Sequence, residues 1–380
     1  MLFCCLLAAG VLLLLVIVAI VSRGLNRSSA AAASVRVSPA LARVLGRKAG
    51  GDAADKKKQA SAVAAIVGAI AAVVTGIAVA KKFNDGDITP EISEISAGAL
   101  HGTMINARNS DPVVLIVPGS GPTDRDGNSP LGLKTDAYKL LAEGLIDRSI
   151  ASVRIDKHGM FGSTEAGNPN AVTPAVYADD IHAWIDAIKE ERGSDCVFLL
   201  GHSEGALMVT LAAQGRDDVC GLILVAGMGR TMGDVIREQL KANPANAPIL
   251  DEALTALSEL EAGRHVDTIG MTPALLPLFN AGVQDYLISV LTIDPVEELR
   301  IAGKETLIVQ GDHDLQVSVA DARLLDAAPK TELRIISGMN HVLKDAPEDR
   351  AGNLATYADP DLPLADDLVR RIRNFVKDND

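Results

Sequence analysis

The spacing of hydrophobic residues changes near residue 90 of the 380-residue chain. Beyond that point, short apolar runs alternate with stretches in which apolar residues recur every three or four positions. The runs predict buried strands, and the stretches predict amphipathic helices. Strands are expected at Val113–Val117, Ala151–Ile155, Cys196–Leu200, Gly221–Ala226, Thr306–Gln310 and Glu332–Ile336. Helices are expected at Asp136–Ile150, at Thr173–Glu191, from Ala206 onward, at Val319–Ala327 and at Pro363–Val376. This alternation predicts an α/β fold, with a mainly parallel sheet that has helices on both faces.

Residues 229–298 interrupt the alternation. These 70 residues have a mostly helical pattern, clearest over Asp251–Ala262, and no strong strand signal. An insertion of helices between two strands predicts a helical cap on the α/β core. We therefore expect the core to consist of residues 90–228 and 299–378.

The first 82 residues have a different pattern, which predicts a membrane-anchoring region. Residues 2–22 and 61–80 contain no charged side chain. A helix of about 20 residues spans roughly 30 Å, the thickness of a bilayer core, so both stretches are candidate transmembrane helices in contact with lipid. Between them, residues 23–58 contain nine Lys/Arg and two Asp/Glu.

A basic loop beside membrane spans usually faces the cytoplasm. This rule places the loop inside and the rest of the protein in an extracytoplasmic compartment. Two alternatives stay open. Residues 1–22 can be read as a signal peptide, although they lack a basic start and a clear cleavage site, and cleavage would allow the opposite topology. Residues 23–47 can also be read as part of a targeting segment.

The composition of residues 83–380 excludes some classes of function. The formal net charge is −13, and residues 83–380 hold 25 Lys/Arg against 47 Asp/Glu. This acidity disfavours nucleic-acid binding. The chain is 48% hydrophobic, which excludes disorder as its main character. Four cysteines are too few for a disulfide scaffold.

A Gly-x-Ser-x-Gly pattern, from Gly201 to Gly205 with Ser203 at its centre, lies between a predicted strand and a predicted helix. The chain must turn sharply there, and the two glycines remove Cβ atoms that would collide. The turn lifts Ser203 above the sheet at a helix N-terminus, which favours developing negative charge. Ser203 is therefore the candidate nucleophile. The alternative is an ordinary turn in which Ser203 caps the helix.

A serine nucleophile needs a base, and the base needs an acid to orient it. His341 and His313 both follow late strands. We favour His341, in a short loop after Glu332–Ile336, because His313 is more typical of a surface loop. Two acids, Asp314 and Asp312, stand in the loop after Thr306–Gln310. We favour Asp314, because Asp312 comes directly after a glycine and is more typical of a turn.

A glycine-rich loop, Gly119-Ser120-Gly121, follows the strand Val113–Val117. Such a loop lets a backbone N–H approach a substrate oxygen. We expect the N–H groups of Ser120 and of Glu204, the residue after the nucleophile, to form the oxyanion hole.

Spacing excludes three other kinds of site. Asp124 stands where a dinucleotide-binding loop needs its third glycine. The acidic loop that begins at Asp124 has Ser129 and Thr135 where a calcium loop needs Gly and Glu. We expect Arg125 in this loop to pair with a neighbouring carboxylate. No Cys/His spacing suits zinc, so neither a metal nor a cofactor is expected.

Four sequence blocks together resemble the α/β-hydrolase superfamily over about residues 90–378. The nearest resemblance is to bacterial carboxylesterase-like proteins grouped with serine aminopeptidases of the S33 type. The blocks are Pro118–Gly127, Arg154–Gly159, Gly201–Gly205, and Gly311–Val317 with Asn340-His341. The resemblance implies the α/β-hydrolase fold and a triad of Ser203, Asp314 and His341. One block departs from the family, since Arg-Gly-x-Gly is usual after the acid at position 156 and His158-Gly159-Met160 stands here.

These features predict a serine hydrolase that cleaves small-molecule acyl esters through an acyl-enzyme. Two alternatives remain. An aminopeptidase or amidase on the same triad would need a cap carboxylate to hold the substrate's amine, and the candidates are Asp251, Glu252, Glu259 and Glu261. The second alternative is an inactive, membrane-tethered binding protein that keeps the hydrolase fold.

Overall fold

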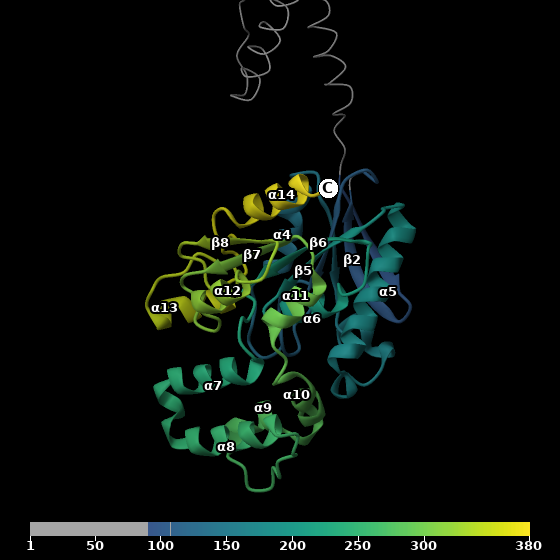
Figure 1. Ribbon diagram of the computed structural model, residues 1–380. Helices are drawn as coiled ribbons and strands as arrows, with labels where there is room; N and C mark the ends of the chain where they lie inside the picture. The colour runs from purple at the N-terminus through teal and green to yellow at the C-terminus, as the bar shows by residue number, and fades with distance from the viewer. Residues whose placement is uncertain (1–89, 107) are drawn as a thin grey trace, which may run out of the picture. The chain divides into compact units, whose positions relative to one another are not determined.

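Figure 1 shows the computed structural model of the protein, which describes residues 90–106 and 108–380. The predicted membrane-anchoring region, residues 1–82, lies outside these described residues, so its two candidate spans stay predictions. Within the described part of the chain, no single helix combines the length and the apolar character needed to cross a bilayer. The helices of Pro273–Val290 and Pro295–Ala302, bent by 57°, meet both criteria only when they are taken as a pair.

Eight strands of the described residues form one sheet in the order β1-β2-β4-β3-β5-β6-β7-β8. They are β1 (Glu91–Ala97), β2 (Leu100–Asn106), β3 (Val113–Val117), β4 (Ala151–Ile155), β5 (Val197–His202), β6 (Val219–Val225), β7 (Thr306–Gly311) and β8 (Thr331–Ile336). β2 runs antiparallel to both β1 and β4, and every other pair of neighbours is parallel. The prediction of a mainly parallel sheet is confirmed.

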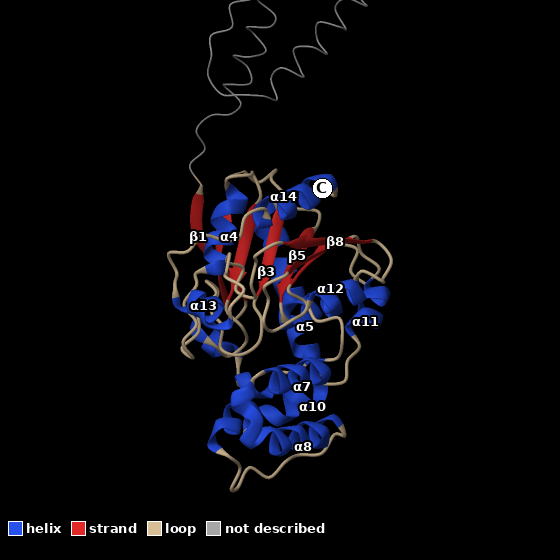
Figure 2. Ribbon diagram, turned by 90° about the vertical axis from the view of Figure 1, so that its left-hand side faces the viewer, coloured by secondary structure: helices blue, strands red, loops and turns tan. Residues whose placement is uncertain are grey.

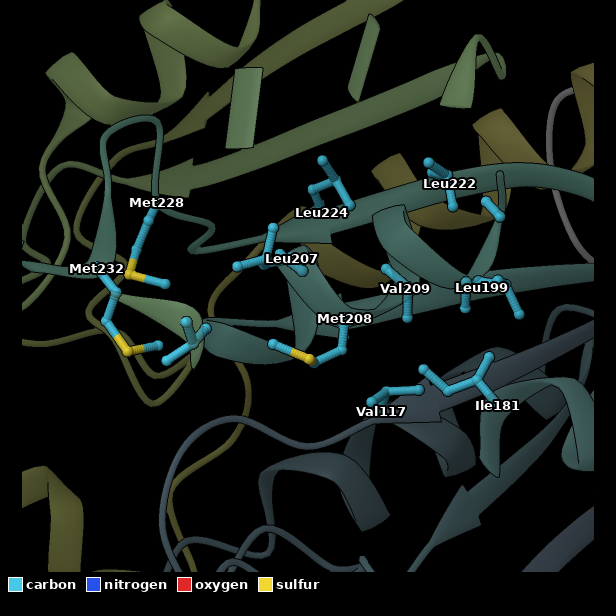
Figure 3. Close-up of a cluster of buried hydrophobic side chains, with 14 of the residues drawn as sticks. Val117, Ile181, Leu199, Leu207, Met208, Val209, Leu222, Leu224, Met228 and Met232 are labelled. Carbon is cyan, nitrogen blue, oxygen red and sulfur yellow. The ribbon is translucent and has the colours of Figure 1, made fainter. Parts of the chain in front are cut away.

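Helices cover both faces of this sheet. α4 (Ala137–Ile146) and α14 (Leu368–Asp378) pack on one face, and α5 (Pro174–Arg192), α6 (Glu204–Ala212), α11 (Pro295–Ala302) and α12 (Val319–Leu325) pack on the other. Successive residues of a strand point to opposite faces. Val114 of β3 accordingly joins the α4/α14 layer, whereas Leu115 and Val117 join the α5/α6 layer. Figure 3 shows the second layer, in which Val117 lies near Ile181 of α5 and Met208 of α6. Burial on both faces explains why these strands are continuous apolar runs in the sequence.

A group of helices separates β6 from β7. The chain forms α7 (Met232–Ala242), η3 (Pro244–Ile249), α8 (Leu250–Glu261), η4 (Pro273–Leu275), α9 (Leu276–Phe279), η5 (Ala281–Val283) and α10 (Gln284–Val290) before it reaches α11. Figures 1 and 2 both show α7, α8 and α10 gathered together apart from the sheet. α11 packs against α6 instead, so the layer over the sheet resumes at Pro295, inside the range 229–298 predicted for the cap.

The remaining elements are short and follow strand ends. They are η1 (Phe161–Ala166) and η2 (Pro169–Ala171) after β4, and α13 (Arg350–Ala355) and η6 (Thr356–Ala358) after β8. The last helix starts later than the predicted Pro363, because Leu364 forms a β-bridge with Lys344 and α14 begins only at Leu368.

Two features were not predicted from the sequence. The first is the hairpin of β1 and β2, which extends the sheet before β3. The second is a disulfide between Cys196, directly before β5, and Cys220 in β6, with Cα atoms 5.4 Å apart. It joins two neighbouring parallel strands where their register shifts, at the end of β5 that is distant from Ser203.

Candidate active site

The Gly-x-Ser-x-Gly segment forms a sharp turn between β5 and α6. Ser203 lies between the last residue of β5 and the first of α6, with φ 56° and ψ −121°. A side chain other than glycine rarely adopts this conformation, which costs about 1–3 kcal/mol. A Cβ at Gly201 would overlap the backbone of Gly205, and one at Gly205 would lie 2.6 Å from the carbonyl oxygen of Pro118. The two glycines are therefore required for the tight packing of β5, α6 and the loop after β3.

His341 and Asp314 form a hydrogen-bonded pair. His341 Nδ1 lies 2.8 Å from Asp314 Oδ2, and the Asp314 side chain is 1% exposed. The amides of Gln316 and Val317 donate to Asp314 Oδ1 at 2.7 and 3.0 Å. Burial by itself would raise the pKa of Asp314, but His341 and these two donors hold that pKa below its usual value. Asp314 is thus a carboxylate that can accept the Nδ1 hydrogen of His341, which leaves Nε2 as the other ring nitrogen available for contacts.

The competing acid of the same loop points elsewhere. Asp312 Oδ1 accepts a hydrogen bond from the amide of Gly338 at 2.7 Å. His313 Nδ1 contacts the carbonyl oxygen of Ala346 at 2.6 Å. Of the two candidate acids, Asp314 is therefore the one that the fold brings to His341.

Ser203 and His341 line one cavity of about 510 Å³, together with Gly119, Ser120 and Glu204. These residues follow β5, β8 and β3, at the carboxyl ends of the strands. In the described chain, no hydrogen bond joins Ser203 Oγ to His341. Such contacts often become short only when a substrate is bound. The cavity thus brings together the residues that the sequence singled out from three separate segments.

The glycine-rich loop after β3 lies against the nucleophile. A Cβ added at Gly119 would be 3.1 Å from Ser203 Cβ, and Gly121 has φ +71°. Ser120, between them, is exposed. Within the described residues, the N–H groups of Ser120 and Glu204 donate to no protein acceptor. Both amides are therefore free to bind an oxygen that enters the cavity.

His202 links three parts of this site. Its Nε2 lies 2.8 Å from the carbonyl oxygen of His341, and its Nδ1 lies 2.8 Å from the hydroxyl of Tyr138. A carbonyl only accepts, so Nε2 carries the hydrogen and the Tyr138 hydroxyl donates to Nδ1. The same hydroxyl accepts from the amide of Gly119 at 3.3 Å. Burial, and the nearby His341, lower the pKa of His202 to about 3, so this side chain stays neutral.

The cap supplies a mostly apolar wall to the cavity. Met232, Val235 and Ile236 come from α7, Leu278 from α9 and Leu287 from α10. One contact of the cap is polar. The hydroxyl of Tyr286 in α10 donates to a carboxylate oxygen of Glu204, in the turn that carries Ser203. Most of the wall is therefore suited to an uncharged, aliphatic group.

The four acids proposed for amine recognition do not line the cavity. Glu259 pairs with Arg264 at 2.7 Å, and Glu261 pairs with Arg237 at 2.6 Å. Glu252 accepts from the backbone of Thr272, and Asp251 is exposed. Glu204 is the one carboxylate among the described residues that line the cavity.

The charged side chains of the acidic loop that begins at Asp124 form hydrogen bonds and ion pairs within the protein. Arg125 pairs with Asp156 at 2.7 Å and with Glu94 at 2.7 Å, as the sequence predicted for a neighbouring carboxylate. Asp124 Oδ1 accepts from the amides of Asp126 and Asn128 at 2.9 and 2.8 Å. Among the described residues, no group of three or more His, Cys, Asp or Glu side chains is arranged to hold a metal ion.

Sequence reasoning missed Tyr138, Lys157, His202 and Tyr286, all of which line the cavity. Two of them lie inside blocks that the sequence had singled out: Lys157 in Arg154–Gly159 and His202 beside the nucleophile. Their hydrogen-bond partners lie on distant segments, so no local pattern indicated what they do.

Comparisons with known proteins found one matching family and several similar solved structures. The sequence profile of a family described as serine aminopeptidase, S33, matches residues 131–263. Solved structures similar to this chain include Est1E from Butyrivibrio proteoclasticus (18% identity, 76% of this chain and 98% of that chain, TM-score 0.45). A second is the Pyrococcus furiosus esterase PF2001, with 14% identity over 77% of this chain and 92% of that chain and a TM-score of 0.49. A third is a proline iminopeptidase from Mycobacterium smegmatis, with 14% identity over 76% of this chain and 98% of that chain and a TM-score of 0.47. No curated protein matches the sequence.

The Asp314–His341 pair leads to a prediction about the two acids of one loop. We expect Asp314→Asn to lower kcat for p-nitrophenyl butyrate by about 10³–10⁴-fold, because the amides of Gln316 and Val317 hold the Asn oxygen and leave its NH2 group facing His341 Nδ1, which favours the wrong imidazole tautomer. Asp312→Asn is the matched control, since an amide oxygen can still accept from Gly338, and it should stay within a few-fold of the parent. Steady-state kinetics of both variants decide the matter. Equal losses in the two variants would contradict the assignment of the acid.

Proposed function

Because the chain is a member of the α/β-hydrolase superfamily, we propose that it is a serine hydrolase that cleaves carboxylic esters through an acyl-enzyme. The observation that carries this proposal is the arrangement around one cavity. A strained Ser203, the buried Asp314–His341 pair and a glycine-rich loop with a free amide all meet there. Such an arrangement suits nucleophilic attack on a carbonyl group.

In the first half of the proposed reaction, His341 Nε2 takes the proton of Ser203 as Oγ bonds to the ester carbon. The resulting oxyanion accepts hydrogen bonds from the amides of Ser120 and Glu204, each worth roughly 3–4 kcal/mol in the transition state. His341 then gives its proton to the departing alkoxide, which leaves as the alcohol. Asp314 keeps the imidazole oriented and stabilises its positive charge throughout.

In the second half, a water molecule replaces the alcohol. His341 takes a proton from the water as its oxygen attacks the acyl carbon, and returns that proton to Ser203 Oγ when the acyl–serine bond breaks. The products are a carboxylic acid and the free enzyme. Apart from the ester and one water molecule, these steps need no further reactant to balance.

The lining of the cavity supports an uncharged acyl group. The wall from α7, α9 and α10 is apolar, and burying a charged amine without a partner costs several kcal/mol. A second candidate function, an aminopeptidase or amidase, is favoured by one observation. Glu204 is a buried carboxylate beside the nucleophile, and it is the acid left to hold a substrate's amine.

The role of the nucleophile is tested with Ser203→Ala. We expect kcat for p-nitrophenyl butyrate to fall by several orders of magnitude while the fold is retained, because the attacking oxygen is removed. A fluorophosphonate probe should label the parent protein at Ser203 and leave the variant unlabelled. Circular dichroism serves as the control for folding. A folded parent that neither hydrolyses esters nor reacts with the probe would favour the inactive binding protein.

The two candidate substrates separate in a second experiment. We expect higher kcat/KM for p-nitrophenyl butyrate than for alanine p-nitroanilide, because the cap wall is apolar. Glu204→Gln and Glu259→Gln form a matched pair, since Glu259 lies on the surface of the cap with Arg264. A preference for the anilide that disappears in Glu204→Gln and persists in Glu259→Gln would instead establish the aminopeptidase.

We further propose that residues 1–82 anchor the protein in a membrane and that the hydrolase domain lies in an extracytoplasmic compartment. The uncharged stretches 2–22 and 61–80 and the basic loop 23–58 support the anchor. The Cys196–Cys220 bond supports the location, because structural disulfides persist mainly in oxidising compartments.

This location is tested on the full chain in cells. After an alkaline carbonate wash, we expect the protein to stay in the membrane pellet, because two apolar spans resist extraction. After acid trapping and alkylation, mass spectrometry should find the peptides of Cys196 and Cys220 joined. A soluble chain would contradict the anchor, and alkylated Cys196 and Cys220 would contradict the location.

A further inference from the structure

Lys157 lies in the loop after β4, between Asp156 and His158. Its side chain is buried, with the residue 4% exposed, yet it lines the cavity beside Ser120 and Ser203. Lys157 Nζ donates to the carbonyl oxygen of Gly119 at 2.7 Å and also to that of Gly121. Among the described residues, no carboxylate forms an ion pair with this ammonium. A buried charge held only by two backbone carbonyls of the oxyanion loop needs an explanation.

The explanation lies in the geometry of one peptide group. The carbonyl of Gly119 and the N–H of Ser120 belong to the same peptide unit, and in a trans peptide these two bonds point in opposite directions. An ammonium that holds the Gly119 oxygen on one side therefore directs the Ser120 N–H to the other side. The amide of Gly119 is held as well, by the Tyr138 hydroxyl at 3.3 Å. The Gly119–Ser120 peptide is thus held through its own carbonyl oxygen and through the amide of the peptide before it.

The charge also acts on the strength of the donor. A hydrogen bond from an ionised donor is about twice as strong as a neutral one. In a buried setting, an ammonium at the oxygen end polarises the peptide and makes its N–H a better donor. Both effects apply to the amide that we expect to meet the oxyanion.

We propose that Lys157 is a positioning residue, which orients and polarises the Gly119–Ser120 peptide so that the Ser120 N–H can bind the oxyanion. This inference rests on the proposed serine hydrolase function. Lys157 does not touch the reacting atoms, and its effect passes through the backbone of the loop. Its expected contribution is to kcat, because the oxyanion exists only after attack has begun.

Several titratable groups surround Lys157. They are Glu204 of α6, Tyr177 and Asp180 of α5, Tyr138 of α4, His202 of the nucleophile turn, and Asp156 and His158 of its own loop. Burial lowers the pKa of Lys157 to about 8, although the Glu204 carboxylate acts in the opposite direction. As the pH rises through about 8, the ammonium loses its proton and the carbonyl of Gly119 loses its charged partner. We therefore expect kcat to fall on the alkaline side with little change in KM.

Kinetics of Lys157→Met and Lys157→Arg test the inference. Lys157→Met should lower kcat for p-nitrophenyl butyrate by about 10²-fold, with KM nearly unchanged and no fall near pH 8, because one oriented donor is lost. Lys157→Arg keeps the charge at high pH, so it should restore part of kcat and move the alkaline fall upward. Lys189→Met removes an ammonium that pairs with Asp218 outside the cavity, and it should keep the parent profile. A folded Lys157→Met with the kcat and pH profile of the parent would overturn the proposal.

A spectroscopic measurement tests the same link without turnover. The sequence contains three Gly–Ser peptides, at 119–120, 162–163 and 193–194, so labelling with 13C-carbonyl glycine and 15N-serine gives three amide signals. The signal of Ser120, assigned as the one lost in Ser120→Ala, should titrate near pH 8 in the parent and not in Lys157→Met. A Ser120 signal that does not respond to Lys157 would refute the link. A responding signal in a protein that fluorophosphonate does not label would support the link and count against the hydrolase.

Discussion

The reversal of the chain between β5 and α6 constrains everything around it. Ser203 can hold its strained conformation only because Gly201 and Gly205 let the strand, the helix and the loop after β3 come together without Cβ atoms. The same close packing leaves so little room beside the nucleophile that a Cβ added at Gly119 would lie 3.1 Å from Ser203 Cβ. One steric condition therefore sets both the position of the hydroxyl and the position of the loop that would receive the oxyanion. The cost of the strain is met by the buried sheet on which the turn is built.

The sequence predicted those parts of the fold whose signals are local. Buried parallel strands are continuous apolar runs, so β3 to β8 could be placed, and the glycine spacing marked the turn at Ser203. β1 was missed because it is largely exposed, with Ile92 at 67%, and because its two isoleucines stand three positions apart and so lack the alternation typical of a strand. The disulfide was missed because Cys196 and Cys220 are 24 residues apart, and only the pairing of β5 with β6 makes them neighbours.

The candidate site divides in the same way. Asp314 and His341 could be selected because each follows a late strand, and the fold then brings them to 2.8 Å. The contacts of His202, Tyr138 and Lys157 could not be foreseen. Each contacts a backbone group of another segment. The type of a residue does not indicate which distant carbonyl or amide it will contact. Backbone partners of this kind become visible only when the loops are placed in space.

The disulfide and the nucleophile occupy opposite ends of one strand. Cys196 precedes the first residue of β5 and Ser203 follows the last, so about 20 Å of extended chain separates the sulfur bridge from the hydroxyl. A covalent bond at the far end ties β5 to β6 at the base of the sheet, and the loops around Ser203 are held by other contacts of their own. A substitution at the disulfide can thus change resistance to unfolding without altering the residues of the candidate site, because the two lie at opposite ends of β5.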